Sequence, residues 1–93
     1  MSKGALNILT LELAKQLGPR GITVNTLAPG VVETDLSTRL LGDPQVRQFA
    51  SSLSALGRIG QPDDIADVAA FLASHDGRWV TGQYIDATGG SQL

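Results

Sequence analysis

Residues 22–34 read ITVNTLAPGVVET, and the strands and helices of this chain are best predicted outward from this stretch. Residues 22–27 form a short, mostly apolar run with little alternation, which is typical of a strand covered on both faces. Pro29 fixes its own φ and lacks a backbone donor, and Gly30 tolerates unusual backbone angles, so this pair predicts a turn after the strand. Thr34 then stands where a helix is expected to begin, with its hydroxyl free to cap that helix or to meet a ligand.

Further helices and a second strand are predicted on both sides of this stretch. Helices are expected over residues 3–17, 35–41 and 62–74 and from Asp43-Pro44 onward, and a second strand over residues 84–87. The first helix is expected to bury a stripe formed by Leu6, Leu9, Leu13 and Leu17 and widened by Ala5, Ile8 and Ala14. This order predicts an α/β fold in which the 62–74 helix is the right-handed crossover between two parallel strands. Ligands of such sheets bind at the carboxyl ends of strands, so residues 29–34 are the best candidate contact.

The composition fits one small domain and argues against several classes of protein. The 93 residues carry a net charge of −2, so no basic surface favours nucleic acid. There is no cysteine, which excludes disulfides and thiolate metal sites and is compatible with a cytoplasmic location. No apolar run approaches the ~20 residues of a membrane span, and no signal peptide is evident. We therefore expect no metal, no nucleic acid and no membrane partner.

Four segments stand in a characteristic order, at residues 2–6, 22–34, 57–66 and 81–90. Together they resemble the C-terminal part of a short-chain dehydrogenase/reductase, and the resemblance covers all 93 residues. No single segment is decisive, but four in order at plausible spacing are highly specific. The resemblance implies the C-terminal half of a Rossmann-type doubly wound parallel sheet, with two strands and three to four helices.

The resemblance also implies an activity, which is hydride transfer between NAD or NADP and a small carbonyl or alcohol. Lys3 matches the catalytic Lys, which holds the cofactor ribose and lowers the pKa of a proton-transferring Tyr. Lys3, Pro29, Gly30, Val32 and Thr34 match cofactor-binding positions. The Val32 backbone would bond the nicotinamide carboxamide, and Thr34 would offer its hydroxyl and N–H to the adjacent phosphate. Residues 35–60 resemble the substrate lid, whereas the substrate and the choice of dinucleotide stay open.

The sequence departs from the family pattern at its beginning. The family's catalytic Tyr lies four residues before the Lys, which falls two residues ahead of Met1, and the catalytic Ser is also absent. Gly57 and Gly60 do not form a G-x-G-x-x-G phosphate loop. Met1 can be a natural start or a result of truncation. We expect the isolated chain to bind no dinucleotide and to be catalytically incompetent; the alternatives are a non-enzymatic oligomerisation or interaction module and an inert truncation product.

The remaining candidate side chains have structural explanations. His75, the only histidine, lies at the end of a predicted helix, where capping is favoured over metal binding. Asp63 and Asp64 open a helix whose dipole favours acids, and we expect Asp64 to lie away from residues 29–34. Trp79 and Tyr84 are interpreted as packing or interface residues. The expected partner is a second copy of the chain or the N-terminal half that the family carries.

Overall fold

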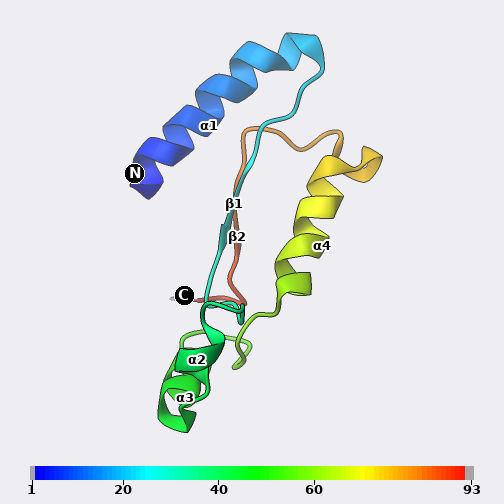
Figure 1. Ribbon diagram of the computed structural model, residues 1–93. Helices are drawn as coiled ribbons and strands as arrows, with labels where there is room; N and C mark the ends of the chain where they lie inside the picture. Colours follow the sequence, from blue (N-terminus) through cyan, green and yellow to red (C-terminus); the bar gives the residue numbers. More distant parts are fainter. Residues whose placement is uncertain (1, 92–93) are drawn as a thin grey trace. The chain divides into compact units, whose positions relative to one another are not determined.

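A computed structural model describes residues 2–91 as an α/β fold (Figure 1). Its elements are α1 (Lys3–Leu17), the 3-10 turn η1 (Gly18–Arg20), β1 (Thr26–Pro29), α2 (Thr38–Leu41), α3 (Pro44–Ser52), α4 (Pro62–Ala73), the 3-10 turn η2 (His75–Gly77) and β2 (Tyr84–Ala87). The two strands pair in parallel, and α4 stands between them in the sequence as the crossover helix. The α/β class, the parallel pair and the four helices confirm the sequence-based prediction.

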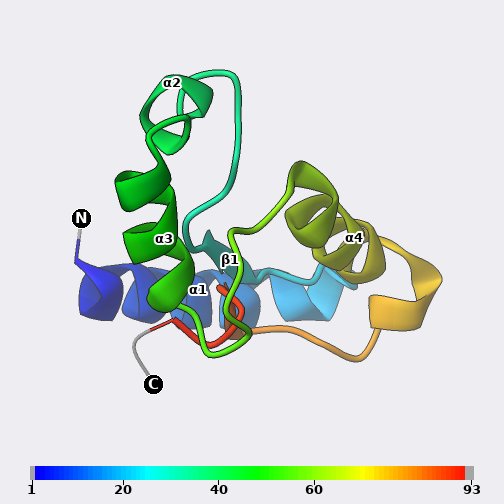
Figure 2. The same cartoon turned by 90° about the horizontal axis from the view of Figure 1, so that it is seen from below.

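The described residues form two compact units. The first unit contains residues 2–28 and 69–85 and includes α1 and η2, and the second contains residues 29–68 and 86–91 and includes α2 and α3. Within the second unit α2 and α3 are neighbours, as both views show (Figures 1 and 2). No helix within residues 2–91 is long and apolar enough to cross a membrane.

The first unit packs α1 through small side chains. Thr10 and Ala14 are its buried residues, and the Thr10 hydroxyl donates to the Leu6 carbonyl at 2.8 Å while contacting the Thr26 hydroxyl of β1. Ala14 is buried as expected, whereas Ile8 and Leu9, also expected in the packed stripe, are 63% and 43% exposed. The physical reason is that short side chains, one of them hydrogen-bonded to the strand, let the helix backbone approach closely where leucines would hold it away.

The predicted strand at residues 22–27 is displaced, because the regular strand begins only at Thr26. Just before the strand, the Asn25 side chain forms hydrogen bonds in place of those between strand backbones. Its Nδ2 donates to the Val80 carbonyl at 3.0 Å, and its Oδ1 accepts from the Gln83 N–H at 3.1 Å. An amide side chain that supplies both a donor and an acceptor satisfies the facing backbone without strand geometry.

Pro29 is the last residue of β1, so it lies in the strand and not in the predicted turn. The Thr26 N–H donates to the Gln83 carbonyl and the Gly30 N–H donates to the Ala87 carbonyl, so alternate residues face β2. Pro29 lies at the intervening register, where its missing N–H is not needed by β2. A Cβ on Gly30 would lie 3.1 Å from Thr88 Cα, which accounts for glycine at this close approach.

The second unit is held by a small apolar core and a capped helix. Leu41, Ala50 and Ile59 form the core, each less than one tenth exposed. As predicted, Asp43 caps α3, because its Oδ1 accepts from the Gln45 N–H at 2.9 Å, with proline following at the first helical position. The cap and the core together fix α3 within this unit.

The tight turn at Gly77 predicts a large difference between two glycine substitutions. A Cβ on Gly77 would lie 2.5 Å from the Phe71 carbonyl oxygen and 3.0 Å from Leu72 Cα. We expect Gly77→Ala to lower the free energy of unfolding by roughly 1–3 kcal/mol, the usual range for overpacking. Gly18→Ala is the matched control, because Gly18 is right-handed helical and a Cβ there meets nothing within 4 Å. Chemical denaturation measures both, and equal unfolding midpoints would contradict the expectation.

Candidate functional site

The loop after β1 is held against the segment that precedes α4. Val32 and Gly60 form a parallel bridge, in which the Gly60 N–H donates to the Val31 carbonyl at 2.9 Å and the Glu33 N–H donates to the Gly60 carbonyl at 2.8 Å. A Cβ on Gly60 would lie 3.2 Å from the Val31 carbonyl oxygen, so a side chain at this position would require the two backbones to move apart slightly.

The bridge leaves the backbone groups of Val32 facing the opposite side. Because Gly60 bonds to the residues before and after Val32, the Val32 N–H and C=O point away from Gly60. The Val32 carbonyl accepts from the Ser37 hydroxyl at 3.0 Å, and the Val32 N–H has no acceptor among residues 2–91. A carbonyl has a second lone pair, so Val32 can offer one donor and one acceptor to a planar amide.

Thr34 does not cap α2, contrary to the prediction. α2 begins at Thr38, whose N–H donates to the Thr34 carbonyl at 2.8 Å. The Thr34 N–H donates to the Ser37 Oγ at 2.8 Å, and the two hydroxyl oxygens lie 3.3 Å apart. A local side-chain bond of this kind competes with helix initiation, which delays the helix. The hydroxyl of Thr34 is therefore more available to a ligand than its N–H.

Ser37 is a site residue that the sequence reasoning missed. Its hydroxyl lies within hydrogen-bonding distance of both the Val32 carbonyl and the backbone N–H of Thr34, and so it holds the whole loop. The signal in the sequence is a serine three residues after a threonine at an expected helix start, a spacing at which a hydroxyl can reach back to the backbone.

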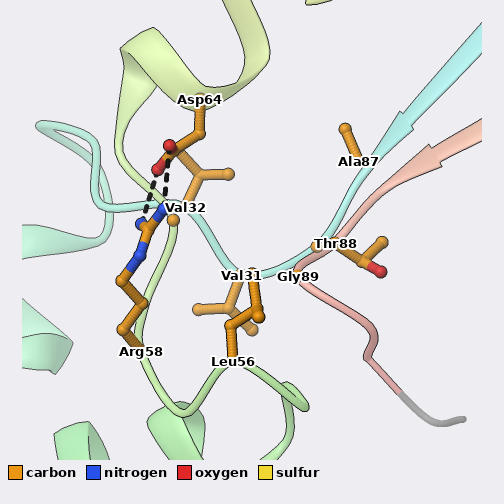
Figure 3. A pocket seen from close by; sticks show the side chains of 10 residues that line it. Val31, Val32, Leu56, Arg58, Asp64, Ala87, Thr88 and Gly89 are labelled. Carbon is orange, nitrogen blue, oxygen red and sulfur yellow. Dashed lines mark hydrogen bonds and ion pairs between the residues drawn. The ribbon is translucent and has the colours of Figure 1, made fainter.

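A cavity of about 40 Å³ lies beside this loop in the second unit (Figure 3). It is lined by residues 30–32 and 87–89 together with Leu56, Arg58, Gly60 and Asp64. This volume holds water-sized molecules and is too small for a nicotinamide ring.

Asp64 lies at this cavity, which corrects the expectation that it lies away from the loop. Arg58 donates to both of its carboxylate oxygens, at 2.7 and 3.0 Å, as the dashed lines in Figure 3 show. Asp64 also accepts from the Gln61 N–H at 2.7 Å, which caps α4 as its position in the first turn implied. The hydrogen bonds from Arg58 and then from Gln61 lower the pKa of Asp64 to about 2.

A second bidentate ion pair in the same unit joins Glu33 to Arg47. Arg47 of α3 donates to its two oxygens at 3.0 and 3.2 Å, and Gln61 Nε2 donates to Oε1 at 3.1 Å. The hydrogen bonds from Arg47 and then from Gln61 lower the pKa of Glu33 to about 2. Local spacing could not predict this cluster, because its partners lie 14 and 28 residues away in the sequence.

Lys3 lies in the first unit, at the exposed beginning of α1. Its ammonium is 4.8 Å from the centre of the Tyr84 ring, which is within the range of a cation–π interaction. Pro29, Gly30, Val32 and Thr34 belong to the second unit, so the structure brings these four together and describes Lys3 separately. Their roles toward a cofactor stay predictions.

The other singled-out residues lie in the first unit. His75 begins η2, and Arg78 Nη1 donates to its carbonyl at 2.9 Å and lies 3.3 Å from its Nδ1. Tyr84 is half-buried, whereas Trp79 is 96% exposed and so does not pack within the described residues. Residues 2–91 contain no group of three or more His, Cys, Asp or Glu side chains able to hold a metal ion.

Comparison with known proteins identifies the family. A family model described as enoyl-(acyl carrier protein) reductase matches residues 1–92. An uncharacterized oxidoreductase of Methylorubrum extorquens is 49% identical over 90 residues, which are 96% of this chain and 36% of that protein. The chain therefore belongs to the short-chain dehydrogenase/reductase family, and it spans about a third of the length of the curated relatives it matches.

Solved structures of the family have the same fold. The angucycline C-6 ketoreductase LanV with bound NADP is 50% identical, with a TM-score of 0.83, over 97% of this chain and 34% of LanV. The reductase LugOII, which catalyses keto-reduction at C1 during lugdunomycin biosynthesis, is 44% identical, with a TM-score of 0.86, over 98% of this chain and 35% of LugOII. The chain thus matches part of the Rossmann fold of these structures.

The two ion pairs of the second unit predict a loss of stability in acid. The pKa of Glu33 falls from its usual 4.5 to about 2 on folding, and that of Asp64 from 3.8 to about 2. A lowered folded-state pKa stabilises the fold above the ordinary pKa, and this contribution is lost as the pH falls toward 2. The loss in free energy of unfolding caused by Glu33→Gln should be largest near neutral pH and should shrink between about pH 4.5 and 2.

Denaturation midpoints across this pH range measure the effect, for Glu33→Gln and for Asp64→Asn. Glu12→Gln is the matched control, because the ion pair that Glu12 forms with Lys15, at 3.7 Å, is exposed to solvent. If the loss of stability in Glu33→Gln stayed constant down to about pH 2, the ion pair between Glu33 and Arg47 would not be the source of this stability.

Proposed function

We propose that this chain forms the nicotinamide-side part of an NAD- or NADP-dependent oxidoreductase that interconverts a ketone and an alcohol. The observation that carries the proposal is the Val32 backbone, whose N–H lacks an acceptor among the described residues, on a loop at the carboxyl end of β1. Cofactors of open α/β sheets bind at that end of the strands. Membership of the family gives the same expectation.

The relatives support both the reaction and the cofactor class. LanV is a ketoreductase with bound NADP, and LugOII performs a keto-reduction. A ketone is accordingly the substrate class that we propose here. The residues that distinguish NAD from NADP lie in the family's N-terminal half, so the choice between the two stays open.

Each site residue has a proposed part in the reaction. The dinucleotide, when bound, supplies or accepts the hydride. The Lys3 ammonium would bind the ribose hydroxyls and lower the pKa of the family's Tyr, which lies ahead of Lys3. The Val32 N–H and C=O would orient the carboxamide. The Thr34 hydroxyl would donate to a phosphate oxygen, because the N–H of Thr34 already donates to Ser37.

We also propose that residues 1–93 on their own are catalytically incompetent. They contain neither a Tyr-x-x-x-Lys segment nor a G-x-G-x-x-G loop. A positioned acid contributes about 10²–10⁴-fold to the rate, and a phosphate loop supplies backbone donors to the dinucleotide. A cytoplasmic location and the exclusion of nucleic-acid and membrane partners stay predictions from the composition.

Substitution of Lys3 and Thr34 tests the placement of the cofactor in the complete gene product that includes these residues. Thr34→Ala should weaken dinucleotide binding by about 1 kcal/mol, the scale of one hydrogen bond. Lys3→Ala should weaken it more and also lower kcat, because it removes both a ribose ligand and the charge that lowers a pKa. Calorimetric titration with NADH and NADPH, and absorbance assays with a panel of ketones, measure these effects.

Lys15→Ala is the matched control for Lys3→Ala, since Lys15 lies on the same helix and forms an exposed pair with Glu12. It should bind and turn over like the unaltered protein. Residues 1–93 alone should give no turnover. Turnover by this polypeptide that depended on Lys3, or equal losses in the Lys3 and Lys15 variants, would overturn the assignment.

A second candidate function, association through α1, is favoured by a specific observation. α1 exposes Ile8, Leu9 and Leu11 by 63%, 43% and 40% of their surfaces. Apolar side chains grouped on one helix are typical of a surface that a partner covers. The proposed partner is a second copy of this chain or the N-terminal half found in the family.

Association predicts that residues 1–93 are not monomeric at micromolar concentration. Ile8→Glu should reduce the mass measured by light scattering, because it puts a charge into the apolar surface. Gln16→Glu is the control, since it adds the same charge at an exposed polar position of α1. A folded monomer for the unaltered polypeptide would count against this second function.

A further inference from the structure

We propose that Glu33 is a positioning residue, whose carboxylate ties the loop at residues 31–34 to Arg47 of α3 and to Gln61 ahead of α4. Through these bonds the loop and α3 would respond together to a bound dinucleotide. The inference rests on the proposed function, because that function assigns the nicotinamide end of the cofactor to this loop.

Glu33 is attached to its surroundings through both its backbone and its side chain. Its N–H donates to the Gly60 carbonyl at 2.8 Å, and its two carboxylate oxygens accept from Arg47 at 3.0 and 3.2 Å. Gln61 adds a further bond at 3.1 Å. Val32 and Thr34 are its immediate neighbours in the chain. Any rotation of the Glu33 backbone therefore moves the two residues that would contact the cofactor.

The chemistry of the pair suits a fixed position. A guanidinium and a carboxylate that share two parallel hydrogen bonds are held in direction as well as distance. The Glu33 side chain is 26% exposed and that of Arg47 46%, so the carboxylate is the more shielded partner. The hydrogen bond from Arg47 also lowers the pKa of Glu33 to about 2, so the carboxylate is charged at any pH at which the protein would act.

α3 transmits the position of Arg47 to the rest of the second unit. Arg47 lies on the same short helix as Ala50, which packs with Leu41 and Ile59 in the core. Residues 35–60, which resemble the substrate lid, include this helix. Glu33 therefore links the segment proposed to meet the cofactor with the segment proposed to cover the substrate.

A purely structural ion pair makes a different prediction. Partly exposed pairs usually contribute little to stability, and their loss lowers the stability of free and ligand-bound protein alike. A positioning residue, in contrast, changes the affinity for the dinucleotide and the response of α3 to it. The decisive measurement therefore compares free and bound protein, with stability as a separate readout.

The first experiment measures dinucleotide affinity in the complete gene product. Glu33→Gln and Arg47→Gln should each raise the Kd for NADH or NADPH about tenfold, the range expected for losing hydrogen bonds to a charged group. The double variant Glu33→Arg with Arg47→Glu should recover most of this loss, because it restores the pair with reversed charges. Glu12→Gln is the matched control and should bind like the unaltered protein. Equal affinities for the Glu33, Arg47 and Glu12 variants would overturn the inference.

The second experiment follows hydrogen exchange of the α3 amides with and without saturating dinucleotide. In the unaltered protein these amides should exchange more slowly when NADH or NADPH is bound. In Glu33→Gln at saturation the same slowing should be lost, and in the charge-reversed double variant it should return. Normal slowing in Glu33→Gln would overturn the inference and leave the proposed function standing. An unaltered protein that bound neither dinucleotide would overturn the proposed function and this inference with it.

Discussion

The backbone pairing of Val32 with Gly60 is the contact on which the candidate site depends. It joins the end of β1 to the segment before α4, and the absence of a Cβ on Gly60 leaves room for the Val31 carbonyl at this close approach. A bridge of this kind uses the residues on either side of Val32 and leaves the Val32 N–H for another acceptor. The same contact thus stabilises the second unit and creates the donor on which the proposed cofactor contact rests.

Two ion pairs and one hydroxyl hold the loop in this arrangement. Arg58 with Asp64 fixes the start of α4, and Arg47 with Glu33 fixes α3 to the loop. Ser37 then engages backbone groups of both Val32 and Thr34. Side chains from three segments therefore determine how a loop without regular secondary structure presents its backbone, which is how loops become rigid enough to bind a cofactor.

Local signals in the sequence predicted much of the fold. Asp43 followed by a proline predicts the start of α3, because a cap bond forms within one turn of chain. The crossover helix, the last strand and the parallel pairing follow from periodicity and element order in the same way. Asp64 as a helix-start acid was also predictable, whereas its place beside the loop was not.

Several features that the sequence did not reveal depend on long-range or competing hydrogen bonds. The strand began late because Asn25 bonds to residues 55 and 58 positions away, and Glu33 found partners 14 and 28 positions away. Thr34 does not cap α2 as expected, because its N–H donates to the Ser37 hydroxyl oxygen and the helix begins later. The amino-acid sequence thus specified the helices, the strand pair and the family, since these depend on spacing along the chain. Which donors the loop leaves open was settled by folding, because it depends on side chains that only the folded chain brings together.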